Sequence, residues 1–196
     1  MSVSDKLPAP AKAGVDTGFV VRHAESQRGR VCLAILPSSD RLYVTATLGF
    51  DVCIDRTAPD IAAQLAAACP KGIDVYFELT GGRVFDAVLP LLNPFAWVPV
   101  CGTIATRNAT RLPDGPDRTP LLLGTILTQS LTFRGFIVSE FQGDAPEFTT
   151  RMAAWLTAGH IRYREDVTQG LDRMVDAFIG MLDGCNFGKT LIRLAD

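Results

Sequence analysis

Apolar runs alternate with amphipathic segments along the chain, and this pattern predicts strands that alternate with helices. The clearest unit runs from Gly72 to Gly102. Its first apolar run, Ile73 to Leu79, stops at a Thr-Gly-Gly turn and predicts a buried strand. Apolar side chains then recur at helical spacing as far as Asn93-Pro94, and a second apolar run follows from Ala96 to Cys101. Strand, helix and strand within this length predict one βαβ unit with two parallel strands.

The remaining segments continue the same alternation. The predicted strands are Arg30 to Leu36, Phe50 to Asp55, Leu131 to Val138 and Lys189 to Leu194. The predicted helices are Arg41 to Leu48, Asp60 to Ala68, Leu121 to Thr128, Glu147 to Ala158 and Leu171 to Leu182. This order predicts an α/β fold with a Rossmann-like, doubly wound and mostly parallel sheet that carries helices on both faces.

The first strand of such a sheet is degenerate or missing in this sequence. The stretch LPAPAKA, at residues 7–13, is neither apolar nor β-prone, and Phe19-Val20-Val21 fits a strand as well as a helix. Because the first strand is central in a doubly wound sheet, its slot must be filled by Phe19 to Arg22 or by a segment of another chain. We expect residues 1–17 to be a flexible lead-in and residues 18–196 to form one domain.

Composition narrows the classes of partner. With 47% apolar and 20% charged residues the chain is an ordinary globular protein, and a net charge of -2 gives no reason to expect nucleic acid. Without a run of eighteen apolar residues or a secretion signal, we expect no membrane span and a cytoplasmic location. The five cysteines form no C-x-x-C motif, so we expect buried free thiols and no metal site.

Candidate functional residues lie where the strands of the central unit end, because ligands of parallel sheets bind beyond the carboxyl ends of the strands. Those ends are Glu78 to Gly82 and Cys101 to Arg107. Glu78 is either a functional carboxylate or a solvated turn residue. Gly81-Gly82 either lets the backbone approach a ligand or supplies a turn with positive φ.

One short motif points to a different chemistry. Arg22-His23-Ala24-Glu25 resembles the R-H-x-E strand end of the histidine phosphatases, in which the histidine accepts a phosphoryl group. That chemistry needs a second histidine at the same point. The other histidine, His160, lies in an amphipathic segment, so an exposed side chain is the favoured interpretation of His23.

Several long motifs, in one order, resemble a known family. They are LGFDVCID, DVYFELTGGRVFDAVLPLLNPFAWVPVCG, LPDGPDRTPLLLGTILTQSLTFRGFIV, YREDV and DAFIGMLDGCNFGKTLIRL. They are similar to the cofactor-binding half of the medium-chain dehydrogenase/reductase superfamily, in its zinc-independent branch of prostaglandin, alkenal double-bond and curcumin reductases. The resemblance runs from about residue 29 to the end. It implies that residues 18–196 are a Rossmann-like NADP-binding domain with a C-terminal helix–strand extension. The family's N-terminal catalytic domain has no counterpart in this sequence.

The resemblance implies an NADP(H)-dependent oxidoreductase that transfers hydride to the double bond of an α,β-unsaturated ketone or aldehyde. It places Arg41 on the ribose 2′-phosphate, with Ser38 beside it, which suits a cation after a strand end. It implies that the loop after the second strand of the central unit passes the nicotinamide, that the main chain at 136–138 bonds the carboxamide, and that Asn186 reaches back to the cofactor. The implied cofactor-binding residues are Gly18, Ser38, Arg41, Cys101, Gly102, Thr103, Ile104, Ala105, Thr106, Arg107, Phe136, Ile137, Val138 and Asn186. Catalytic residues and the identity of the substrate are not assigned.

The sequence departs from the family at the glycine turn that receives the pyrophosphate. The family pattern A-x-x-G-x-x-G aligns with Lys12 to Gly18, where Val15 replaces a glycine and Asp16 brings a carboxylate towards the phosphates. We therefore expect weakened NADP binding. The alternative function is a non-catalytic nucleotide-binding or dimerisation module, and in either case we expect a homodimer through the edge strand Leu131 to Val138.

Overall fold

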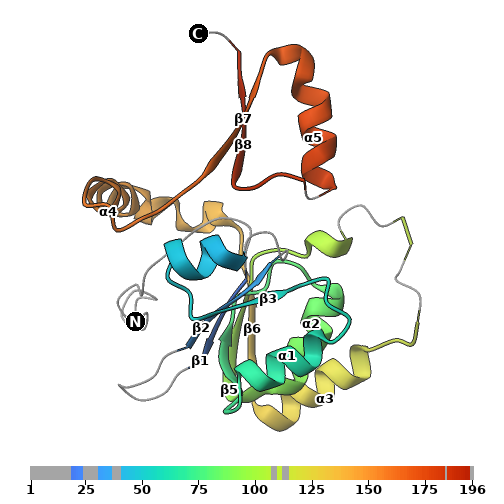
Figure 1. Ribbon diagram of the computed structural model, residues 1–196. Helices are drawn as coiled ribbons and strands as arrows, with labels where there is room; N and C mark the ends of the chain where they lie inside the picture. The colour runs from blue at the N-terminus through green and yellow to red at the C-terminus, as the bar shows by residue number, and fades with distance from the viewer. Residues whose placement is uncertain are drawn as a thin grey trace. The chain divides into compact units, whose positions relative to one another are not determined.

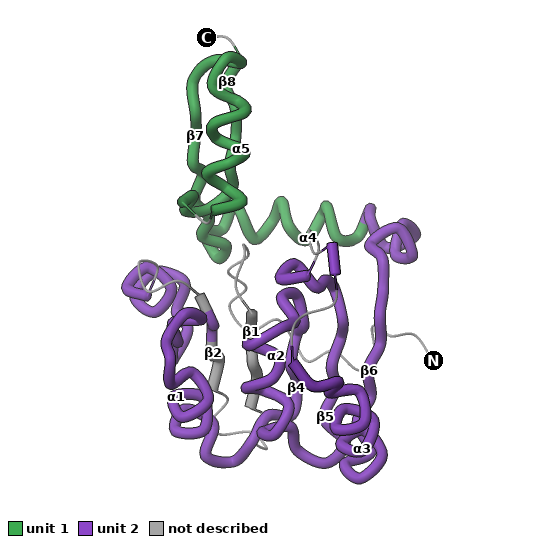
Figure 2. The backbone as a smooth tube through the Cα atoms, turned by 90° about the vertical axis from the view of Figure 1, so that its right-hand side faces the viewer, with its two compact units in different colours: residues 1–17, 147–196 green, residues 18–146 purple. Residues whose placement is uncertain are grey.

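The computed structural model describes residues 19–23, 31–36, 41–106, 110–111, 115–183 and 185–194. These residues form two compact units, one that ends at Pro146 and one that begins at Glu147 (Figure 2). Gly18, Ser38 and Arg107, three of the predicted cofactor-binding residues, lie outside the described residues, as do the predicted lead-in and the glycine turn.

The first unit is built on a six-stranded sheet with the order β3-β2-β1-β4-β5-β6 (Figure 1). Its strands are β1 (Phe19–His23), β2 (Val31–Leu36), β3 (Val52–Asp55), β4 (Ile73–Tyr76), β5 (Leu92–Val100) and β6 (Thr132–Gly135). β2 and β3 are parallel, and so are β4, β5 and β6. The predicted doubly wound, mostly parallel sheet is therefore confirmed.

β1 fills the central slot, and it runs in the opposite direction to its neighbours. It pairs antiparallel with β2, from Phe19↔Ile35 to His23↔Val31, and antiparallel with β4 through Val21↔Tyr76. The connection between β1 and β2, residues 24–30, is shorter than the dozen or so residues that a parallel crossover needs. Of the two alternatives for the slot, the structure supports the one in which this chain fills it.

Helices cover both faces of the sheet. α1 (Ile61–Ala68), α2 (Gly82–Val88) and α3 (Thr119–Gln129) lie on one face, and a helical segment with its π-helical part at Tyr43–Thr47 lies on the other (Figure 1). The strands divide their side chains accordingly, because successive residues of a strand point to opposite faces. In β3, Ile54 belongs to the core under α1 and α2, whereas the preceding Cys53 packs with Val44 and Phe50.

The end of α2 differs from the prediction. The helix ends at Val88, a 3-10 turn covers Leu89–Leu91, and β5 begins at Leu92, so that Asn93-Pro94 lies inside a strand. Pro90 supplies no backbone N–H and crowds the preceding turn, which ends the α-helix early. Asn93 then fixes the start of β5, because its Nδ2 donates to Lys71 O and to Asp74 Oδ1, both at 2.9 Å.

The second unit contains a two-stranded parallel sheet and two helices. α4 (Ala145–Thr157), which begins at the end of the first unit, leads to β7 (Glu165–Gln169), α5 (Met174–Leu182) and β8 (Lys189–Arg193). The five pairs of the sheet run from Glu165↔Lys189 to Gln169↔Arg193. β7 was not predicted as a strand, since its sequence EDVTQ holds a single apolar residue and its strand form depends on pairing with β8.

The cysteines differ from the expectation. Cys69 is buried, but Cys101 and Cys185 are exposed, so the expectation that the cysteines are buried is wrong for these two. No helix in the described part of the chain is both long enough and apolar enough to cross a membrane.

The contact between Gly72 and Asn93 gives a test of the turn before β4. Gly72 has a φ of +79°, and a Cβ built on it would overlap Asn93 Oδ1. We expect Gly72→Ala to lower the free energy of unfolding by about 2 kcal/mol, because it combines backbone strain with loss of the Asn93 contacts. Gly124→Ala, inside α3 with no atom within 4 Å of its Cβ, is the control and should raise the stability by about 0.5 kcal/mol. Urea denaturation measures both, and a neutral Gly72→Ala would contradict the account.

Candidate functional site

The carboxyl ends of five strands lie along one edge of the sheet, which we call the rim. β2 and β4 are each antiparallel to β1, so they are parallel to each other, and β3, β5 and β6 follow their direction. Leu36, Glu78 and Cys101 therefore lie at the same edge, and Val138 follows β6 there. The strands that these positions follow or end are labelled in Figure 1.

Glu78 organises the turn that follows β4. Its side chain is 3% exposed, so it is a buried carboxyl and not a solvated turn residue. Its Oε1 accepts hydrogen bonds from Thr80 N at 2.6 Å and from Gly81 N at 2.7 Å. Gly81 and Gly82 have φ values of +70° and +56°, a conformation that side chains with a Cβ rarely adopt. The two glycines thus supply a turn with positive φ, which is one of the two roles that the sequence left open.

Main-chain hydrogen bonds join this turn to the loop after β5. Cys101 N donates to Glu78 O at 2.8 Å. Further into the loop the pattern continues: Ile104 N donates to Leu79 O at 3.0 Å, and Ala105 N donates to Thr80 O at 2.9 Å. A Cβ built on Gly102 would lie 3.4 Å from Leu79 O, so the loop passes close to the turn. The loop itself is short and ends in the 3-10 turn Ile104–Thr106. Turn and loop therefore form one hydrogen-bonded structure at the rim.

The environment of Glu78 changes its acidity. Burial raises the pKa of Glu78 above its ordinary value of 4.5, and the N–H groups of Gly81 and Thr80 oppose that rise in part. Tyr76, two residues earlier on the same face of β4, has its pKa raised by burial and then by the nearby Glu78 carboxylate. The Glu78 carboxyl and the Tyr76 phenol are thus both buried beside the turn that follows β4.

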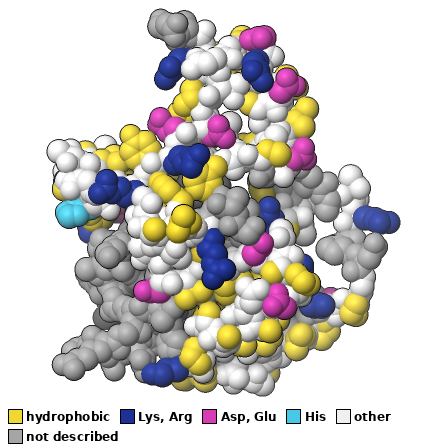
Figure 3. Space-filling model, viewed as in Figure 1, with side chains coloured by type: hydrophobic (Ala, Val, Ile, Leu, Met, Phe, Trp, Pro, Cys, Tyr) yellow, Lys and Arg dark blue, Asp and Glu magenta, His cyan; other side chains and the backbone are white. Residues whose placement is uncertain are grey.

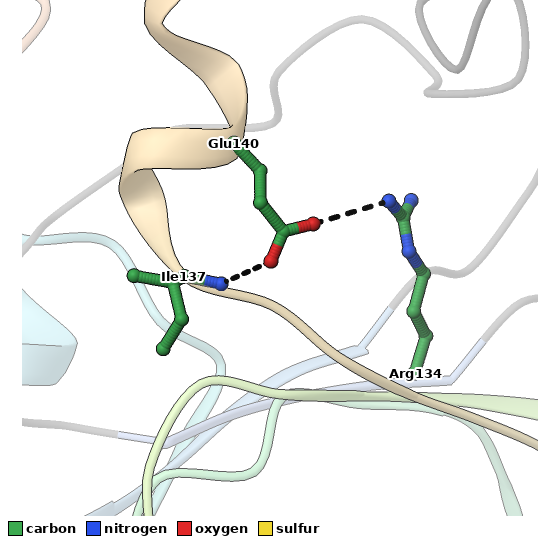
Figure 4. A network of polar contacts seen from close by, with 3 residues as sticks. All are labelled: Arg134, Ile137 and Glu140. Carbon is green, nitrogen blue, oxygen red and sulfur yellow. Dashed lines mark hydrogen bonds and ion pairs between the residues drawn. The ribbon is translucent and has the colours of Figure 1, made fainter.

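At the end of β6, an acidic side chain turns the backbone into a helical segment. Ile137 N donates to Glu140 Oε1 at 2.8 Å, and Arg134 Nη2 lies 3.8 Å from Glu140 Oε2 (Figure 4). The predicted strand Leu131 to Val138 therefore ends at Gly135, and Val138 begins a 3-10 helix. The Ile137 N–H belongs to the segment whose main chain the resemblance placed on the carboxamide, and here it donates to the Glu140 carboxylate.

Aromatic side chains anchor this segment on the sheet. The Phe136 ring lies 6.3 Å from the Phe77 ring and 5.6 Å from the Phe141 ring, measured between centroids. Ile137 and Val138 are 67% and 80% exposed. The segment thus has an anchored side and an apolar side that faces outward.

The structure brings most of the predicted cofactor-binding residues to the rim. The loop Cys101 to Thr106 follows β5, the segment Phe136 to Val138 follows β6, and Phe136 N donates to Val100 O at 3.3 Å. Arg41 is exposed at the start of the helical segment after β2. Asn186 belongs to the second unit, where its Nδ2 donates to Gly188 O at 3.0 Å.

Sequence reasoning missed two supports of the rim. Arg83, at the start of α2, donates to Ala58 O and Thr57 O and so holds the loop after β3. Thr80 is buried at 8% exposure. No local signal marks the Arg83 contacts, because the residues are 25 and 26 positions apart. The position of Glu78 at the end of an apolar run is the signal for its burial.

Among the described residues, no group of three or more His, Cys, Asp or Glu side chains is arranged to hold a metal ion. Basic and acidic side chains are interspersed with apolar ones on the face that Figure 3 shows.

The acidity of Glu78 predicts how stability varies with pH. Because its folded-state pKa is raised, its contribution to stability is fully present below pH 4.5 and is lost as the pH rises through the folded-state value. Glu78→Gln has no such proton. We therefore expect the free energy of unfolding of the wild type, relative to that of Glu78→Gln, to fall with increasing pH. Urea denaturation between about pH 4 and about pH 8 measures it, and a constant or rising difference would refute the assignment.

Comparison with known proteins identifies the family. Residues 20–156 match the family described as zinc-binding dehydrogenase. The chain is 53% identical to the NADPH-dependent curcumin reductase of Escherichia coli over 154 residues. The match covers 78% of this chain and 45% of that protein. It is 33% identical to prostaglandin reductase 1 of Rattus norvegicus over 186 residues, 93% of this chain and 55% of that protein.

A solved structure agrees with these relatives. The crystal structure of CurA from Vibrio vulnificus in complex with NADPH superposes with a TM-score of 0.78 at 47% identity, over 84% of this chain and 49% of that one. The chain spans about half the length of the curated relatives it matches. The sheet order, the rim and these matches show that the chain belongs to the medium-chain dehydrogenase/reductase superfamily, as the cofactor-binding half of its zinc-independent branch of curcumin and prostaglandin reductases.

Proposed function

We propose that this chain is the cofactor-binding half of an NADP(H)-dependent reductase of α,β-unsaturated ketones or aldehydes. The observation that carries the proposal is the rim, where five strands end together and the turn after β4 is hydrogen-bonded to the loop after β5. Relatives named as an NADPH-dependent curcumin reductase and as prostaglandin reductase 1 support the activity. Ligands of open α/β sheets bind at such an edge.

The nicotinamide end of the cofactor would lie against the loops after β5 and β6. Cys101, Thr103 and Thr106 are exposed on the first of these loops, and Thr106 Oγ1 is held by Thr103 O at 3.2 Å. The backbone of this loop is fixed by the turn after β4, so its amides and hydroxyls are pre-positioned. Exposed Ile137 and Val138 offer apolar contact to a ring. These groups fit a planar, partly apolar carboxamide.

The adenosine end would lie beyond β2, where Arg41 supplies a positive charge. Arg41 is exposed and follows the carboxyl end of β2 by a few residues. A guanidinium pairs with a phosphate through two parallel hydrogen bonds. The 2′-phosphate distinguishes NADP from NAD, so this residue would set the preference between them.

When bound, NADPH supplies a hydride that is transferred to the β-carbon of the conjugated carbonyl compound. The part of this chain in that reaction is to bind the cofactor and to orient its reactive ring at the rim. The family resemblance assigns Asn186 to the same cofactor, from the second unit. The free thiols of Cys69, Cys101 and Cys185 support a reducing compartment, the cytoplasm, as the location.

The structure differs from a doubly wound fold at the place where the pyrophosphate of the cofactor would bind. In a doubly wound fold it rests on the N-terminus of the helix that follows the first strand. Here β1 is reversed, and the residues 24–30 that follow it are too few for a helix and a return crossover. We therefore propose that NADPH binds more weakly than to a member of the family with a parallel first strand.

Cofactor titration tests the proposal. We expect NADPH to bind in the micromolar to millimolar range with a change in nicotinamide fluorescence, and to bind more tightly than NADH. Arg41→Gln should raise the dissociation constant for NADPH about tenfold and leave that for NADH unchanged, because only NADPH carries the 2′-phosphate. Lys71→Gln, in the turn before β4 at the opposite edge of the sheet, is the charge-matched control. Absence of binding at millimolar NADPH would remove the oxidoreductase assignment.

The alternative is a non-catalytic module that keeps the fold for pairing with another copy. Two observations favour it: the reversal of β1, which removes the pyrophosphate element, and the position of β6 as an edge strand of the described sheet. β6 pairs with β5 through its residues Thr132 to Gly135 and has no second neighbour among the described strands. An open edge invites pairing with a second chain.

Sedimentation tests pairing at this edge. We propose a homodimer through β6 and expect a dimer at micromolar concentration, because two such edges can extend the sheets into one another. Phe136 N bonds to β5, so the N–H of the preceding Gly135 points to the open side of β6. Gly135→Pro, which removes that N–H, should shift the equilibrium to monomer, whereas Thr125→Pro would break α3 and serves to show loss of fold. A wild type that sediments as a monomer at all concentrations would contradict the proposal.

A further inference from the structure

We propose that Glu78 is a positioning residue of the rim: its carboxylate orders the turn Leu79 to Gly82, and through that turn it sets the loop Cys101 to Thr106 for the cofactor. The inference rests on the proposed function, because the loop is the one assigned to the nicotinamide. It assigns to Glu78 a role that acts through the loop and not by contact with the cofactor.

First, the Glu78 carboxylate holds two main-chain amides of the turn. A single oxygen, Oε1, accepts both Thr80 N at 2.6 Å and Gly81 N at 2.7 Å. Both distances are at the short end for N–H···O bonds, as expected for an ionised acceptor. The side chain is 3% exposed, so water competes little for this oxygen. The carboxylate therefore fixes two successive amides of the turn.

The second step is the connection from the turn to the loop. Leu79 O accepts Ile104 N at 3.0 Å, and Thr80 O accepts Ala105 N at 2.9 Å. These two carbonyls are adjacent to the amides that Glu78 holds. A change in the orientation of either peptide unit would therefore move a hydrogen bond of the loop.

Packing reinforces the same connection. A Cβ built on Gly81 would lie 3.8 Å from Thr103 Cβ, and one built on Gly82 would lie 3.4 Å from Ala105 Cβ. A methyl group added to either glycine would thus make ordinary van der Waals contact with a loop side chain, so the turn and the loop lie close together.

The third step concerns the cost of the carboxyl group. Burial raises the Glu78 pKa, because the ionised carboxylate is less well solvated in the folded chain than in water. The titratable groups beside it that the contacts identify are Tyr76, the last residue of β4, and Cys101, in the loop after β5. An apolar side chain of the same length would avoid the cost. Retention of a costly group that holds the turn is expected if the order of the loop matters for binding.

Three variants separate this role from a merely structural one. Glu78→Gln keeps a carbonyl oxygen that can accept the two amides, whereas Glu78→Met has a similar length and no such acceptor. Asp74→Leu is the control, because Asp74 is a carboxylate near the start of β4 that accepts Asn93 Nδ2, and leucine has a similar size and no acceptor. The readouts are amide hydrogen exchange without cofactor, the NADPH dissociation constant and the midpoint of urea unfolding.

We expect Glu78→Met to increase the exchange rates of the amides of Thr80, Gly81, Ile104 and Ala105 together, and to raise the NADPH dissociation constant at least about tenfold. Glu78→Gln should restore both properties to within about threefold of the wild type. Asp74→Leu should lower the unfolding midpoint, because Asn93 Nδ2 loses this acceptor, and leave NADPH affinity unchanged. A merely structural role predicts instead that affinity follows the unfolding midpoint in all three variants.

Two results would overturn the inference. One is Glu78→Met with wild-type NADPH affinity or with wild-type exchange at the loop amides. The other concerns the wild type, in which we expect the amides of the turn and of the loop to open with the same free energy. Opening of the two segments with different free energies would contradict the inference. This measurement decides the matter even if Glu78→Met does not fold. A wild type that binds no NADPH would remove the proposed function, while the exchange experiment would still decide whether Glu78 positions the loop.

Discussion

The short connection between β1 and β2 is the constraint on which the rest of the structure depends. Residues 24–30 are too few for a crossover helix, so β1 runs antiparallel to β2. The reversed strand also pairs with β4, which completes the centre of the sheet and satisfies backbone groups on both sides. Because β2 and β4 share this antiparallel neighbour, they run in the same direction. The common rim at the carboxyl ends follows from that direction.

In the proposed function, the reversal of β1 changes which elements would bind the cofactor. In a doubly wound fold the element that receives the pyrophosphate follows a parallel first strand, so the donors that we propose are those after β2, β4, β5 and β6. The order of those after β4 and β5 depends, in our proposal, on Glu78, whose buried carboxyl holds two amides of the turn and, through the turn, the loop. At the end of β6, Glu140 has a similar role at the surface, where it holds Ile137 N and turns the chain into a helical segment. Two glutamates thus shape the rim by accepting main-chain N–H groups.

The sequence was sufficient for the elements whose apolar pattern is strong and insufficient where distant contacts decide. Apolar runs predicted β2, β3 and β4, and the order of motifs predicted the sheet type. The early end of α2 depends on Pro90 and on contacts of Asn93 with residues about twenty positions away, which no local pattern shows. The direction of β1 was left open because Phe-Val-Val fits either element, although the length of the following connection already excludes a parallel crossover. At the site, the loop after β5 and the glycines after β4 were predicted, while the burial of Glu78 and the Arg83 contacts needed the folded chain.

The direction of β1 is the central claim, and NMR tests it most directly. Antiparallel strands bring the α-protons of every second residue pair close together across the strands, whereas parallel strands keep them apart. The structure predicts strong cross-strand contacts between α-protons at alternate pairs of the register from Phe19↔Ile35 to His23↔Val31, and close approach of residue 21 or 22 to β4. A pattern of contacts typical of parallel strands, or direct contacts between β2 and β4 with β1 excluded, would contradict the account.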